Sequence, residues 1–109
     1  MIPTDPRGTA NRIFKMAVTS NATELAILLK HYRDAKIISR TDRTPDSAIR
    51  VDYCFGKLDM TLRTLCHEVW TEAFGGGQEA DAWLKNLEEI GPEDSISSRL
   101  TDLVNHYIV

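Results

Sequence analysis

Apolar residues recur most regularly between residues 48 and 73 of this 109-residue chain. Their spacings are threes and fours, which is typical of a helix that buries one narrow seam. The seam positions are Ala48, Val51, Phe55, Leu58, Leu62, Leu65, Val69 and Ala73. The segment Thr44-Pro45-Asp46 before them has the cap, proline and acid of a helix start, and Gly75-Gly76-Gly77 provides a stop. The pattern predicts one long helix over about residues 45–74, about 43 Å in length.

Four shorter segments also have the periodicity of amphipathic helices. They cover about residues 6–18, 22–38, 78–90 and 94–107, and polar or Gly-Pro segments separate them. Asn21 followed by Glu24 predicts a capping box at the start of the second of them. No segment alternates with period two over a useful length, so we expect no strands. The sequence therefore predicts a single all-α domain over residues 1–109, a five-helix bundle around the long central helix.

The long helix carries a second apolar line, roughly opposite the seam. It consists of Ile49, Tyr53, Gly56, Met60, His67, Trp70 and Phe74. A helix that is apolar on two sides is expected to be buried on two sides. Glycine costs about 1 kcal/mol of helix propensity relative to alanine, so we expect another helix to approach closely at Gly56. These features predict a central pillar with shorter helices along both sides.

The seam itself allows two arrangements. The chain's own shorter helices can fill it, or a second copy of the chain can complete it in a homodimer. The residues concerned are Val51, Phe55, Leu58, Leu62 and Leu65. The sequence leaves this choice open.

Composition places the chain among ordinary globular proteins, with 42% apolar and 27% charged residues. No apolar run approaches the roughly 20 residues that span a bilayer, and the first residues have no basic or apolar leader. Cys54 and Cys66 lie on one predicted helix about 18 Å apart, too far for a disulfide with each other. We expect two reduced thiols in a cytoplasmic protein without membrane contact.

Charge is distributed unevenly along the chain. Residues 30–50 hold six basic and three acidic side chains, for a net charge of +3. Residues 68–109 hold nine acidic and two basic side chains, for −7, whereas the whole chain has −3. The sequence is therefore dipolar, with a basic segment before the long helix and an acidic last third.

The acidic last third indicates a binding surface. Small acidic helical proteins often act as inhibitors or immunity proteins, and opposite charge steers association. We expect a non-enzymatic protein-binding module of inhibitor, immunity or adaptor type, whose protein partner is basic or associated with nucleic acid. The residues expected to contact this partner are Glu79, Asp81, Glu88, Glu89, Glu93 and Asp94.

The basic segment permits an alternative, direct binding of nucleic acid. Its cations could contact phosphates, and they are Lys30, Arg33, Lys36, Arg40 and Arg43. However, the pI is about 5.5, and no exposed aromatic residues are interleaved with them. Cations at the end of a helix also complement its dipole, which is the role we favour here.

Arg99 and His106 form the one pattern that resembles a catalytic family. Six residues separate them in Arg-Leu-Thr-Asp-Leu-Val-Asn-His near the end of the chain. This spacing, the chain length and the helicity resemble the all-helical ribonucleases of the HEPN superfamily. The resemblance implies a ribonuclease in which Arg99 and His106 act on the RNA phosphodiester. The chain departs from the family at Leu100, where a polar residue usually follows the arginine.

No metal-binding motif is present. His67 and Glu68 do not begin an HExxH motif, because no second histidine follows at the required spacing. Asp52 and Asp59 lie one heptad apart beside the seam, where interhelical ion pairs with Lys or Arg are expected. We therefore expect neither a metal nor a cofactor.

Overall fold

The computed structural model describes residues 5–108, apart from the side chains of Pro6, Tyr107 and Ile108. Within this range it is all-α, with no strand, as the sequence predicts. The elements are α1 (Pro6–Ser20), α2 (Ala22–Thr41), α3 (Pro45–Phe74), α4 (Gly77–Ile90), the short 3-10 helix η1 (Pro92–Asp94) and α5 (Ile96–Ile108). None of the described helices is both long and apolar enough to span a membrane.

Local side-chain chemistry fixes the helix ends. The Thr44 hydroxyl accepts a hydrogen bond from the Ser47 amide at 3.3 Å, so α3 begins as predicted. Gly75 and Gly76 have φ values of 78° and 77°, a left-handed conformation that favours glycine and ends α3. The capping box at Asn21 was wrong, because its side chain caps no amide of α2. Its Nδ2 instead donates to the carbonyl of Ala17 at the end of α1.

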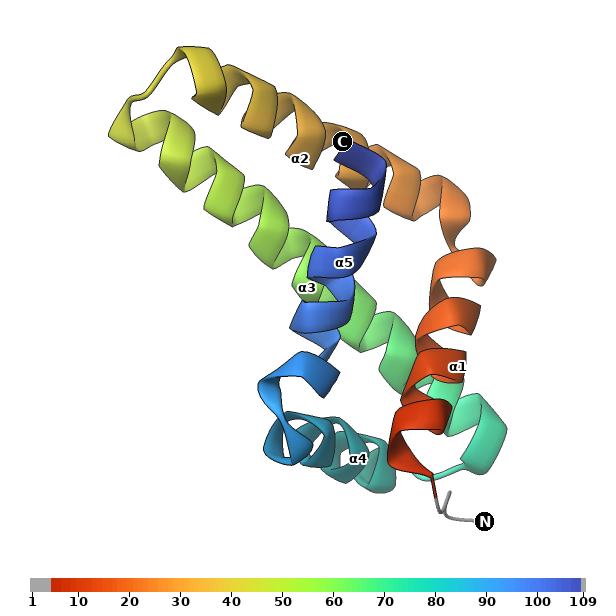
Figure 1. The fold of residues 1–109 in the computed structure, drawn as a ribbon. Helices are drawn as coiled ribbons and strands as arrows, with labels where there is room; N and C mark the ends of the chain where they lie inside the picture. Colours follow the sequence, from red (N-terminus) through yellow and green to blue (C-terminus); the bar gives the residue numbers. More distant parts are fainter. Residues whose placement is uncertain (1–4, 109) are drawn as a thin grey trace.

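The helices form an elongated molecule of 50 × 28 × 23 Å (Figure 1). Helices α1 and α2 follow one another along α3, and α2 pairs with the first half of α3 as an antiparallel hairpin. Helix α4 turns back against the C-terminal part of α3, and α5 crosses the middle of the molecule. The tip of the α2–α3 hairpin, residues 36–46, therefore projects away from the end that carries α4.

The predicted seam is the core of the monomer. Leu58 and Leu62 are fully buried, and Leu65 is 9% exposed. Val51 and Phe55 are partly buried, and the Phe55 ring lies 5.8 Å from that of Tyr32 on α2. The chain's own helices thus fill the seam. Leu58, Leu62 and Leu65 are covered within the chain, and a homodimer interface through the partly buried Val51 and Phe55 stays a prediction.

The second apolar line is buried over only half its length. At the C-terminal end of α3, Trp70 is 3% exposed and stacks on Trp83 of α4. Toward the N-terminal end Tyr53 is 67% exposed, and a Cβ built on Gly56 would meet nothing within 4 Å. The prediction of a pillar buried on two sides, with a helix crossing at Gly56, was therefore wrong for this half. The hairpin extends beyond the reach of α4, so none of the described helices covers its outer face at Tyr53 and Gly56.

Candidate functional site

The strongest charge concentration lies around α4. Residues 68–94 contain eight acidic side chains and a single basic one, Lys85, for a net charge of −7. Helix α4 buries Ala80, Trp83 and Leu87 and turns its polar residues outward. Five of the six acidic residues predicted to bind a partner are exposed. They are Glu79, Asp81, Glu88, Glu89 and Glu93.

Two of these exposed carboxylates hold α4 against α3. Asp81 Oδ1 lies 3.0 Å from His67 Nε2, and Glu88 Oε1 lies 2.6 Å from Arg63 Nη1. The two acids are seven residues apart, which places them on the same face of α4. Asp81 and Glu88 therefore already have partners on α3, whereas Glu79, Glu89 and Glu93 form no ion pair among the described residues.

Arg63 joins three helices at one point. Its Nε donates to Asp59 Oδ2 at 2.8 Å, and its Nη2 donates to the Ser97 hydroxyl on α5 at 3.0 Å. Partial burial lowers the pKa of Arg63, but the hydrogen bonds and charges of Asp59 and Glu88 outweigh it, so the pKa is raised. The predicted interhelical ion pair of Asp59 was wrong, since its cation is on α3 itself. The contact that Asp59 makes with another helix is a hydrogen bond, in which its Oδ1 accepts from the Ser97 hydroxyl of α5 at 2.7 Å.

Asp94 does not belong to the exposed acidic surface. Its side chain is 12% exposed and lies 3.0 Å from Arg7 Nε and 3.9 Å from Arg99 Nη2. It connects η1 to α1 and α5. Its assignment as a partner-binding residue was wrong, because these contacts and its burial leave its carboxylate inaccessible.

Arg99 and His106 line the same shallow depression of about 380 Å³ between α1 and α5. However, the Arg99 side chain is 11% exposed, and its Nε donates to Asn11 Oδ1 at 3.0 Å. Burial lowers the pKa of Arg99, and the nearby Asp94 carboxylate partly opposes this shift. The imidazole of His106 is exposed, whereas the guanidinium is bound within the fold. The arginine is thus positioned to support α5 more than to contact a substrate.

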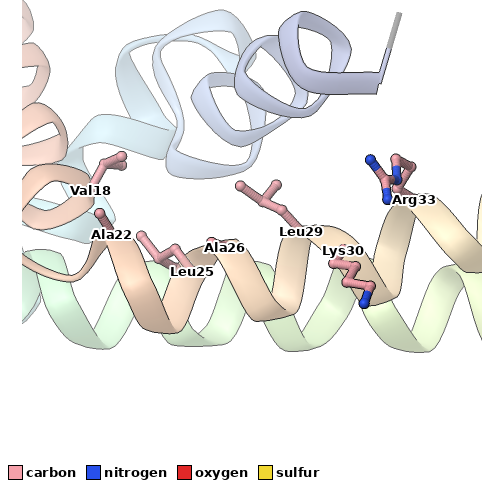
Figure 2. A pocket seen from close by; sticks show the side chains of 7 residues that line it. All are labelled: Val18, Ala22, Leu25, Ala26, Leu29, Lys30 and Arg33. Carbon is pink, nitrogen blue, oxygen red and sulfur yellow. The ribbon is translucent and has the colours of Figure 1, made fainter.

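A small apolar hollow of about 180 Å³ lies beside the junction of α1 and α2. Figure 2 shows Leu29 and Arg33 projecting from α2 toward one side, whereas Lys30 points away. Aliphatic side chains form most of the wall, and the lining residues are Val18, Ala22, Leu25, Ala26, Leu29, Lys30 and Arg33. No nucleophile or acid–base pair faces this hollow, so it is not arranged for catalysis.

The two cysteines differ in accessibility. Both are free thiols; Cys66 is fully buried and Cys54 is partly exposed. Burial raises the pKa of Cys66 from 9.0 to about 12, against weaker effects of Arg99 and Arg63. A thiol that stays protonated is a poor nucleophile. Among the described residues, no three His, Cys, Asp or Glu side chains are grouped closely enough to hold a metal ion.

Comparisons of this chain with protein-family models, with curated proteins and with solved structures find no significant match. The function is therefore inferred from the surfaces described above.

Proposed function

We propose that this chain is a non-enzymatic protein-binding module that docks a basic partner protein on its acidic end. The observation that supports this proposal most is the net charge of −7 over residues 68–94, of which −3 lies on α4 and the rest on the adjoining end of α3 and on η1. A surface of one sign raises the rate of association with an oppositely charged partner and suppresses partners of like charge. This mode of binding suits a small inhibitor, immunity or adaptor protein.

Glu79, Glu89 and Glu93 are the carboxylates proposed to meet the partner. All three are exposed, and none of them forms an ion pair within the described part of the chain. Their charge is therefore available to a cationic surface. Asp81 and Glu88 contribute to the negative electrostatic potential of this surface, although both also contact side chains of α3.

The test is a charge reversal at the free carboxylates. The variant Glu89→Lys with Glu93→Lys is compared with Glu24→Lys with Asp34→Lys, which changes net charge equally but on α2. Proteins captured from native lysate on each immobilised chain are identified by mass spectrometry, at low and at high salt. We expect a basic protein that is retained by the wild type and the control, and lost with the α4 variant or at high salt. Equal retention by all three chains would contradict the proposal.

A ribonuclease of the HEPN type is the second candidate. The observation that favours it is that Arg99 and His106 line one depression. The hydrogen bonds of Arg99 to Asn11 and to the Ser95 carbonyl weaken this candidate, because they hold the guanidinium within the fold. The test is an RNA cleavage assay with the purified chain. If this candidate is right, the wild type cleaves RNA and His106→Ala does not. A wild type that leaves RNA intact would exclude the candidate.

A further inference from the structure

The outer face of the α2–α3 hairpin carries an uncovered apolar stripe. Ile49, Tyr53 and Met60 are 64%, 67% and 68% exposed, and Gly56 lies between them beside open space. The spacings of four, three and four residues place all four on one face of α3. We propose that a second copy of this chain covers the stripe as an antiparallel, two-fold symmetric clasp.

The stripe is complementary to itself in this orientation. A two-fold interface pairs residue i of one copy with residue j of the other, and j with i. An axis between residues 54 and 55 of α3 sets Ile49 against the partner's Met60. The same axis sets Tyr53 over the partner's Gly56, where the missing side chain leaves room for the ring. One register therefore pairs every position of the stripe.

Helix α4 limits how far a covering helix can extend. His67 lies seven residues beyond Met60 and so on the same face of α3, and it contacts Asp81 of α4. A helix laid along the stripe therefore ends against α4. In the antiparallel register, the tip of the partner's hairpin is the part that lies next to α4.

The two ends that meet carry opposite charge. The tip, residues 36–46, contains three basic and two acidic side chains, for +1, and residues 88–93 contain three acidic and no basic ones, for −3. The tip and α4 lie at opposite ends of α3, so this contact forms between copies (Figure 1). Two-fold symmetry makes it twice. The clasp thus assigns the basic hairpin tip of a second copy to the acidic end, and it rests on the proposed function in that respect.

A parallel arrangement fits the same stripe less well. It would bring Asp52 beside the partner's Lys57, but a single exposed ion pair contributes little. It would also place the two acidic α4 helices together, because both lie on the same face at the same end of α3. Repulsion and steric overlap there favour the antiparallel clasp.

The first experiment measures mass by light scattering during size-exclusion chromatography. We expect the wild type to elute with about twice the mass of the 12.3 kDa chain, and Tyr53→Asp to elute as a monomer with unchanged helical content by circular dichroism. The matched control is Ile27→Asp, which alters an isoleucine that is 55% exposed on α2, and it keeps the dimer. A monomeric wild type at all concentrations, or a dimer that survives Tyr53→Asp, would overturn the proposal.

The second experiment tests the orientation by exchanging charges. Arg40→Glu with Arg43→Glu makes the tip acidic, and Glu89→Lys with Glu93→Lys makes the end of α4 basic. We expect each pair of substitutions alone to weaken the dimer at least tenfold, and all four together to restore most of the affinity. No recovery in the fourfold variant would exclude the clasp. Failure here leaves the proposed function standing if a different basic protein is still captured through Glu89 and Glu93.

Discussion

Arg63 illustrates how a single polar residue can organise the contacts of a long helix. It interrupts the second apolar line of α3, and its guanidinium contacts Asp59, Glu88 and Ser97 on three different helices. If a partly buried carboxylate loses the cation that pairs with it, the energetic penalty of its desolvation is no longer offset. The Arg63 side chain therefore stabilises the packing of α3 against α4 and α5 at the edge of the core.

Replacement of Arg63 by alanine should lower the free energy of unfolding by about 1–3 kcal/mol, because it leaves Asp59 without its cation. The matched control is Lys57→Ala on the exposed side of α3, which should change it by less than about 0.5 kcal/mol. Urea unfolding followed by circular dichroism measures both. Equal small effects would show that the junction contributes little.

Cys66 links pH to stability on the alkaline side. The folded pKa is raised from 9.0 to about 12, so the folded state retains a proton that the unfolded state loses. The stability that this provides is complete below pH 9 and is lost as pH rises from 9 to 12. The loss amounts to about 4 kcal/mol, at about 1.4 kcal/mol per pKa unit.

Cys66→Ala removes this titration, so its stability should fall less steeply over the same pH range than that of the wild type. Thiol labelling provides an independent measurement: Cys54 should react in the native protein, and Cys66 only on unfolding. If the free energy of unfolding falls equally with pH in the wild type and in Cys66→Ala, burial of the Cys66 thiol does not cause the loss of stability.

At the scale of elements, α3 shows both what the sequence predicts and where it fails. Its limits, its caps and its buried seam follow from spacing, because periodicity reports directly which face is apolar. The outer stripe could not be assigned, because an apolar face looks the same whether the chain's own helix or another molecule covers it. Gly56 was expected to mark the close approach of a helix, but it faces open space, because α4 packs only against the C-terminal part of α3.

The candidate site was predictable in part for the same reason. Exposed acids on α4 follow from its helical pattern, but the burial of Asp94 depends on how η1 packs between α5 and Arg7 of α1, which is distant in sequence. The roles of Asp81 and Glu88 likewise depend on how α4 turns back on α3.

The two faces of α3 should respond differently to truncation. Leu62→Ala should cost about 2–5 kcal/mol, because Leu62 is fully buried in the seam. Met60→Ala, at 68% exposure, should change stability by less than about 0.5 kcal/mol when measured at a concentration where the chain is monomeric. Thermal and urea unfolding of the two variants test the assignment of the seam. A large loss in Met60→Ala would mean that the outer face is covered within the monomer.

At the scale of the whole molecule, charge and shape act together. The hairpin tip is basic, the α4 end is acidic, and they stand at the two ends of an elongated chain (Figure 1). The apolar stripe connects these two ends along α3. The central claim is that this chain works by association through these surfaces.

Sedimentation velocity of the wild-type chain, over a wide concentration range at low and high salt, tests this claim most directly. We expect a reversible dimer whose dissociation constant rises with salt, because opposed charges join the tip of each copy to α4 of the other. A chain that sediments as a monomer under every condition, or a dimer indifferent to salt, would contradict it.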